Sequence, residues 1–204
     1  MIENKEKIGM EFKTNRIEAL NDGIFAIAMT ILIISFETLF QQPDFLSDSS
    51  LQSLMSQLWP DFLHYCISFL LLGVFWIQHH NHSHYIKRSN TKSLYINIIG
   101  LMFISLIPFS ASVASDYAHL RTAALLFEIN LLLAGVAFFG YWAYASGKRR
   151  LTDDSLDAKT VSYYTRRSLV IPVVSLIAIC LAFVNPRIST MLYLLVPVIL
   201  WVYK

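Results

Sequence analysis

The chain has 204 residues, of which 55% are hydrophobic and 15% are charged, and its formal net charge is +2. Soluble domains carry about 25% charged residues, so this composition excludes an ordinary soluble protein and predicts an integral membrane protein. The small net charge gives no reason to expect a nucleic-acid partner.

Six apolar runs are candidates for membrane spans, each of which needs about 20 residues to cross a bilayer as a helix. They lie at 17–36, 59–79, 94–113, 123–146, 166–184 and 188–203. The last run is short. Because no stretch between the runs is large enough to form a soluble catalytic domain, we expect one all-α transmembrane domain over residues 1–204.

Basic residues are distributed unevenly between the predicted loops. The loop at 37–58 has no Lys or Arg, whereas the loop at 147–165 is strongly basic. All lysines and arginines except Arg121 and Arg187 fall on one side of the membrane if both termini lie in the cytoplasm. Since cytoplasmic loops carry the excess of basic residues, we predict cytoplasmic N- and C-termini.

The first span carries charge in its opening turns and none through its middle. On a helix that advances about 100° per residue, an uncharged face gathers around Ile27, and Asp22 falls on the opposite side. The residues within about 60° of Ile27 on this face are Leu20, Gly23, Ile24, Thr30, Ile31, Ile34 and Thr38. Two interpretations are open: the face meets lipid, or it lines a pore shared by several chains, where a hydrophobic constriction can gate by dewetting.

Polar residues gather at the beginning of the first span and at the end of the second span, in the histidine-rich run 79–84. Because buried polar groups need hydrogen-bond partners, we predict that these two ends, which lie at the same depth, form one network. Its members are Arg16, Asp22, Trp76, His79 and His80. The run contains no Cys or Asp, so we expect no dedicated metal site there.

Three motifs occur together in the first three spans. They are Arg16 followed after three residues by Leu20-Asn21-Asp22-Gly23, then Trp76-x-x-His79-His80, and then Pro108-Phe109-Ser110. The set resembles the transmembrane protein 175 family of potassium channels, whose first motif reads Arg, three residues, Phe-Ser-Asp. Leu20 and Asn21 depart from that motif, whereas the chain length and the six spans agree with the family.

The resemblance implies an assembly and a set of site residues. Family members with one six-helix unit per chain are prokaryotic, so the expected location is the cell membrane of a prokaryote. They form homotetramers in which the first helices line a central pore and bulky apolar side chains, with a threonine layer, select K+ over Na+. Carried onto this chain, the pore-lining, selectivity and gate positions are Ile27, Thr30, Ile31 and Ile34. The network of Arg16, Asp22, Trp76, His79 and His80 would be structural, and K+ would be the permeant ion with no cofactor.

The sequence lacks the Thr-Val-Gly-Tyr-Gly loop by which ordinary potassium channels coordinate bare ions through carbonyl groups. We therefore expect a leak-like, potassium-selective channel whose selectivity comes from side chains. The alternative is a proton-coupled cation or metal transporter that uses Asp22, Glu128 and the run 79–84. A non-transporting scaffold is a third possibility, whereas no nucleophile–base motif or ligand set favours an enzyme.

Overall fold

The computed structural model describes residues 14–34, 48–153 and 156–202, and these residues are almost entirely helical. The helices are α1 (Thr14–Ile34), α2 (Asp48–Gln57), α3 (Trp59–Tyr85), α4 (Thr91–Asp116), α5 (Arg121–Ser146), α6 (Ala158–Ala182), α7 (Pro186–Met191) and α8 (Leu195–Val202). Short 3₁₀ turns follow α5 and α7, at Gly147–Arg149 and Leu192–Leu194. The all-α membrane architecture expected from composition is confirmed.

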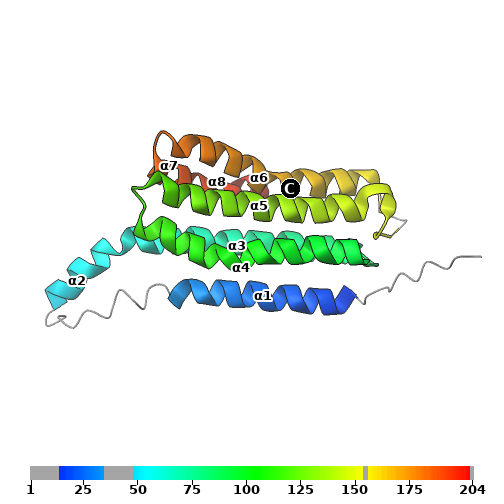
Figure 1. The fold of residues 1–204 in the computed structure, drawn as a ribbon, viewed down its shortest axis with the longest axis horizontal. Coiled ribbons are helices and arrows are strands. Elements are labelled where there is room, and N and C mark those ends of the chain that lie inside the picture. Colours follow the sequence, from blue (N-terminus) through cyan, green and yellow to red (C-terminus); the bar gives the residue numbers. More distant parts are fainter. Residues whose placement is uncertain (1–13, 35–47, 154–155, 203–204) are drawn as a thin grey trace, which may run out of the picture.

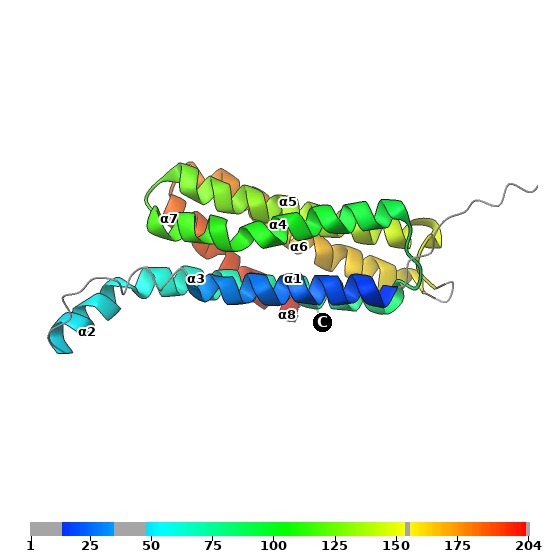
Figure 2. The ribbon, with the colours of Figure 1, turned by 60° about the horizontal axis from the view of Figure 1, so that its bottom comes forward.

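The long helices lie side by side and alternate in direction (Figure 1). α1 forms an outer layer that packs on α3 and α4, and α5 and α6 lie on the far side of that pair (Figures 1 and 2). Because the helices alternate in direction, their termini lie at two opposite ends of the bundle. We call one the α2 end, where α1 and α4 finish and α3 and α5 begin, and the other the Thr14 end, where α1, α4 and α6 begin.

Within the described residues, five helices are long and apolar enough to cross a membrane: α1, α3, α4, α5 and α6. They correspond to the first five predicted spans, although α6 ends at Ala182, two residues before the predicted end of the fifth span. The sixth, 188–203, corresponds to a shorter apolar segment, Pro186–Val202, that is broken at Leu192–Leu194. Pro197 explains the break, because proline is tolerated in the first turn of a helix and not in its interior. Residues 35, 36 and 203 of the predicted spans lie outside the described residues.

The loop predicted at 147–165 is helical in its second half, because α6 begins at residue 158 rather than 166. Asp157 precedes that helix and its side chain accepts a hydrogen bond from the backbone N–H of Thr160 at 3.1 Å. The hydrogen bonds from Thr160 lower the pKa of the Asp157 carboxyl. The first half of the loop turns sharply at Lys148 and Arg149, whose φ angles are 54° and 52°.

The apolar core lies where α1, α3, α4 and α5 meet. Phe138 of α5 is at its centre, with ring centroids 6.0 Å from Phe25 of α1 and 5.7 Å from Phe75 of α3. All three rings are buried, and tilted aromatic pairs at such distances are favourable. This cluster fixes the middle of α1 against the rest of the chain and so determines which side of α1 is left uncovered.

The contact between α5 and α6 depends on a residue without a side chain. A Cβ atom added at Gly135 would lie 2.9 Å from Cδ and 3.0 Å from Cγ of Pro172. We expect Gly135→Ala to lower the free energy of unfolding by about 1–3 kcal/mol, the usual cost of overpacking a tight interface. Thermal unfolding of the purified protein in detergent measures the change.

Gly140→Ala is the matched control, because it places the same methyl group on the same helix. An added Cβ at Gly140 meets no described atom within 4 Å, so the variant should be as stable as the parent or more stable, since Ala favours a helix over Gly by about 0.5–1 kcal/mol. Equal losses in the two variants would contradict the close approach of Gly135 to Pro172.

Candidate functional site

One face of α1 is not covered by any other part of the chain that the structure describes. Ile27, Ile31 and Ile34 have 59%, 45% and 55% of their surface exposed, and Thr30 is also exposed. The Thr30 hydroxyl donates to the backbone oxygen of Ile27 at 2.9 Å, so its hydrogen is already used within the helix. We call these four side chains the α1 stripe.

The opposite face of α1 packs on α3 and α4. Its buried residues are Ile17, Asn21, Phe25, Ala28 and Leu32. They repeat every three or four residues, as one face of a helix does. The α1 stripe therefore meets whatever surrounds the single chain, which is either lipid or further copies of the same protein.

Three buried amide and imidazole groups tie α1 to α3 and α4 near the Thr14 end. Asn21 Nδ2 lies 2.8 Å from His79 Nε2, and Asn97 Nδ2 donates to Asn21 Oδ1 at 2.9 Å. His79 Nε2 is also 3.3 Å from Asn97 Oδ1. Each of the three residues is at most 4% exposed. We call Asn21, His79 and Asn97 the polar triad.

The tautomer of His79 follows from its neighbours. Asn21 Nδ2 is a donor, so Nε2 of His79 accepts from it and carries no proton. The proton is then on Nδ1, which faces the hydroxyl oxygen of Ser83 at 3.4 Å. With this tautomer a donor faces an acceptor at Asn21–His79 and at Asn97–Asn21. His79 Nε2 and Asn97 Oδ1 are then both acceptors, so their 3.3 Å approach is not a hydrogen bond.

A second contact between α1 and α3 lies beside the triad and is more exposed. Trp76 Nε1 donates to Asp22 Oδ1 at 2.9 Å. The ring of Trp76 stacks on His80 with centroids 5.6 Å apart and an angle of 26° between the planes. Of the residues predicted for the network, Asp22, Trp76 and His80 thus lie together in one contact, and His79 lies in the neighbouring polar triad.

Arg16 does not join either contact. It is exposed, and within the part of the chain that the structure describes it makes no hydrogen bond or ion pair. The reason is rotation along α1: Arg16 lies about 120° around the helix from Asp22 and about 140° from Asn21. It shares the side of the α1 stripe instead.

Asn21 is the site residue that sequence analysis missed. Asn21 departs from the family motif to which Arg16 and Asp22 conform, so the resemblance assigns it no role. Its spacing from Phe25 and Ile17 was the available signal, because these three residues lie on one helical face at i and i±4.

A polar cavity of about 370 Å³ opens between the Thr14 ends of α1 and α3. Two carboxylates, Glu18 and Asp22, and three basic side chains, His80, His84 and Lys87, contribute to its wall. His79 of the polar triad also lines it. The cavity therefore gives water access to the edge of the triad without exposing Asn21 or Asn97.

The four histidines of the run 79–84 point to different neighbours. His82 is buried and stacks on Trp142 with centroids 4.5 Å apart, whereas His80 and His84 are exposed. Within the described residues, no three His, Cys, Asp or Glu side chains converge as metal ligands do.

Glu128 lies far from these groups. It is on α5, two turns from the α2 end, whereas Asp22 and the run 79–84 lie toward the Thr14 end. Glu128 is fully buried and neither carboxyl oxygen has a hydrogen-bond partner among the described residues. The residues required by the transporter hypothesis are thus not brought together into one carrier site.

The sequence is similar to a family model and to known channel proteins. Residues 16–108 match a family model described as the endosomal/lysosomal potassium channel TMEM175. A potassium channel of Chamaesiphon minutus is 29% identical over 180 residues, which are 87% of this chain and 88% of the relative. The endosomal/lysosomal proton channel TMEM175 of Gallus gallus is 31% identical over 108 residues, which are 51% of this chain and 22% of that longer protein.

A solved structure shares the fold. The crystal structure of a lysosomal potassium-selective channel TMEM175 homolog from Chamaesiphon minutus matches with a TM-score of 0.80 and 27% sequence identity. The match covers 94% of this chain and 98% of that chain. It includes the long helices that carry the α1 stripe and the polar triad.

Proposed function

Since this chain belongs to the TMEM175 family, we propose that it is a potassium-selective, leak-like cation channel in a prokaryotic cell membrane. The family consists of ion channels, so the expectation that the chain is not an enzyme is confirmed. The permeant ion is K+, and the proposal requires no cofactor.

The observation that carries the proposal is the α1 stripe. Three isoleucines and a threonine form an uncharged face that no other described helix of the chain covers. A single chain offers no conduit through this face, so the ion path requires several copies. We place four α1 helices around a common axis, with Ile27, Thr30, Ile31 and Ile34 of each copy facing the water path.

Ion selection at such a neck depends on dehydration. A ring of isoleucine side chains offers no oxygen to replace water around an ion, and an apolar constriction conducts only while it stays wet. K+ is larger than Na+ and holds its water less tightly, so a narrow apolar neck penalises Na+ more. We therefore expect modest selectivity rather than the high selectivity of a carbonyl filter.

The polar triad and the Trp76–Asp22 contact have a positioning role in this proposal. They fix the rotation of α1 relative to α3 and α4, and that rotation directs the α1 stripe toward the axis. Arg16 lies on the same face of α1 as the α1 stripe, so in this proposal it is at the Thr14 end of the ion path. The distribution of basic residues supports a cytoplasmic location for that end.

Ion flux in proteoliposomes tests the proposal. Vesicles loaded with KCl and diluted into an impermeant cation should develop a membrane potential, and vesicles loaded with NaCl should develop a smaller one. Equal K+ and Na+ permeation, or no permeation, would contradict the proposal. A pH-sensitive dye inside the same vesicles separates proton flux from K+ flux, and saturable flux driven only by a pH gradient would favour the transporter instead.

A further inference from the structure

Two connections that are far apart in the sequence meet at the Thr14 end of the bundle. One joins α3 to α4 and the other joins α5 to α6. Ile86 and Thr152 form an isolated antiparallel bridge between them. The backbone N–H groups of Lys87 and Arg88 both donate to the backbone oxygen of Leu151, at 2.9 Å and 3.1 Å. The two connections therefore form one continuous surface.

This surface carries a strong excess of positive charge. Residues 86–92 and 147–153 together contain six basic side chains and one acidic side chain. Arg88, Lys92 and Arg150 are exposed, and none of the three makes an ion pair with any described residue. We call these three side chains the basic patch. Its charge favours an anionic partner.

The ring of Tyr144 connects the members of the basic patch. The guanidinium carbon of Arg150 lies 5.0 Å from the centroid of this ring, which is a cation–π contact. The Tyr144 hydroxyl accepts a hydrogen bond from Asn90 Nδ2 at 3.1 Å, and Asn90 immediately precedes α4. Lys92 lies in the first turn of that helix. Arg150 is thus held close to the beginning of α4, where Lys92 is.

An uncovered apolar face of α4 continues from the basic patch. Residues spaced three or four apart lie on one side of a helix, and those that follow Lys92 at this spacing are between 43% and 65% exposed. Tyrosine is enriched at the depth of lipid head groups, so the ring of Tyr95 places the basic patch at that depth. We call the exposed residues of this face the α4 stripe: Tyr95, Ile99, Met102, Leu106 and Phe109.

The order of side chains along α4 matches the order of groups in a phospholipid. Cationic groups come first, then a tyrosine ring with a hydroxyl group, and then aliphatic side chains. Lys and Arg form charge-assisted hydrogen bonds with phosphate oxygens, and basic pockets at the ends of membrane helices bind anionic head groups. A soluble anion would use the basic patch alone, and a neutral lipid would use the α4 stripe alone.

We propose that the basic patch and the α4 stripe together bind one anionic phospholipid. Its phosphate lies against Arg88, Lys92 and Arg150, and one of its acyl chains lies along the α4 stripe. The proposal requires only that α4 crosses the membrane, and α4 is one of the five long apolar helices. A chain that bound the lipid and conducted no ions would leave this proposal intact.

Native mass spectrometry of the full chain, released from detergent, tests the proposal by counting bound lipids. Dioleoyl phosphatidylglycerol should stay bound at a concentration at which dioleoyl phosphatidylcholine does not. Glycerol phosphate, which has the anionic group and no acyl chain, should not bind at that concentration. Lys92→Gln and Arg150→Gln should each weaken phosphatidylglycerol binding by roughly five-fold, the usual effect of one basic side chain near an anionic lipid surface. Met102→Gln, which places an amide on the α4 stripe, should weaken the binding of both lipids.

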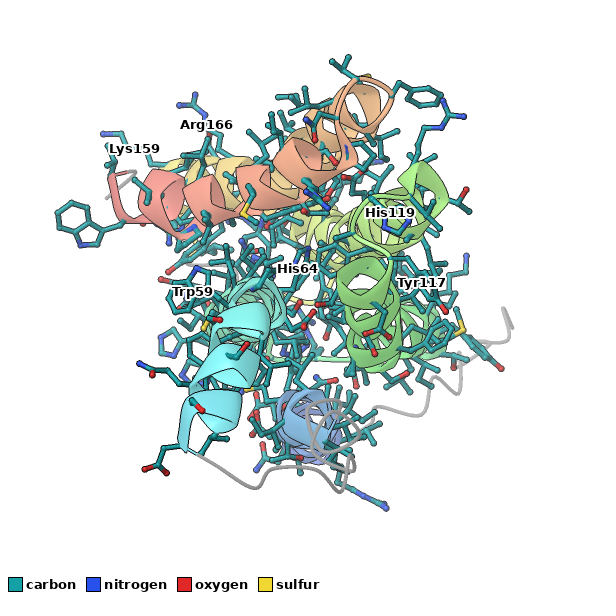
Figure 3. All side chains as sticks on the ribbon, turned by 90° about the vertical axis from the view of Figure 1, so that its left-hand side faces the viewer. Trp59, His64, Tyr117, His119, Lys159 and Arg166 are labelled. Atoms are coloured by element: carbon teal, nitrogen blue, oxygen red, sulfur yellow. The ribbon has the colours of Figure 1, made fainter. Side chains whose placement is uncertain are left out.

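Lys159→Gln is the matched control. Lys159 is the second residue of α6, as Lys92 is the second residue of α4, so the two variants remove the same charge from the same helix position at the same end of the bundle. Figure 3 looks along the bundle and shows Lys159 at the outer edge, on the opposite side from Tyr117, which directly follows α4. Phosphatidylglycerol binding should be unchanged in this variant.

Three results would overturn the proposal. Equal losses in Lys92→Gln and Lys159→Gln, or no loss in Lys92→Gln and Arg150→Gln, would show that the basic patch does not select the lipid. Glycerol phosphate that bound as tightly as phosphatidylglycerol would show a site for a free anion. A change in the number of subunits caused by Met102→Gln would show that a second copy of the chain covers the α4 stripe.

Discussion

Ile27→Asn is expected to raise K+ flux by about ten-fold, which corresponds to a barrier lower by about 1.4 kcal/mol. Ile27 is the most exposed of the three isoleucines in the α1 stripe. If four copies of it narrow an axial path, an amide in its place lets water remain in the neck and lowers the dewetting barrier. The same change should reduce selectivity for K+ over Na+, because an amide oxygen partly replaces the lost hydration of either ion. Flux in proteoliposomes, compared at equal protein content, measures both effects.

Ile177→Asn is the matched control for this experiment. Ile177 lies on α6 and is 53% exposed, close to the value for Ile27. The variant introduces the same polar group on an exposed apolar face of α6, which lies on the far side of the α3–α4 pair from α1 (Figure 1). It should therefore impair membrane insertion without raising K+ flux. If Ile177→Asn raised flux equally, or if Ile27→Asn impaired insertion and left residual flux unaltered, the α1 stripe would have to face lipid.

Asn21→Ala is expected to lower the free energy of unfolding by about 2–3 kcal/mol. The change leaves Asn97 and His79 buried with lost partners, and a buried group deprived of its partner costs about 1–3 kcal/mol. Loss of the triad also frees the rotation of α1, so K+ selectivity should fall together with stability. Denaturant unfolding in detergent gives the first quantity, and the K+/Na+ flux ratio gives the second.

Asn15→Ala is the control on the same helix. Asn15 is exposed in the first turn of α1 and lines the polar cavity at the Thr14 end, so water can replace any partner it loses. Its substitution should change the free energy of unfolding by less than about 0.5 kcal/mol. A similar loss in the two variants would show that the triad does not hold α1 in place.

The uncovered side of α1 could be predicted from sequence because its buried residues and its exposed residues both repeat at the helical spacing. Phe25 and Leu32 are buried, whereas Ile27 and Ile34 are exposed, as a helix of about 3.6 residues per turn requires. The pattern could not say what covers the exposed side, because lipid and a second apolar helix select the same residues.

The partners within the polar network could not be predicted in the same way. The sequence predicts Arg16 and Asp22 in one network, but which side chains meet depends on the direction of each side chain. Asn21 points inward instead, and its partners at positions 79 and 97 come from two other helices. A single sequence does not determine how three helices are rotated about their axes relative to one another, and that rotation decides which side chains meet.

Helix lengths were underestimated for a different reason. Hydropathy measures how much of a segment is apolar, not where its backbone hydrogen bonds end. α3 continues to Tyr85 and α6 begins at Ala158, well beyond the apolar runs 59–79 and 166–184. The side chain of Asp157 caps α6, and a polar cap lets a helix begin before its apolar run does.

The polar triad also constrains how the chain is made. Its members come from the first three long helices in chain order, and Asn21 leaves the ribosome 76 residues before Asn97. Until α4 has been inserted, the amide of Asn21 lacks a partner on α4, and an unsatisfied polar group in hydrocarbon is costly. α1 should therefore reach its final orientation late in biogenesis, after α4 has entered the bilayer, and subunits should assemble only after that step.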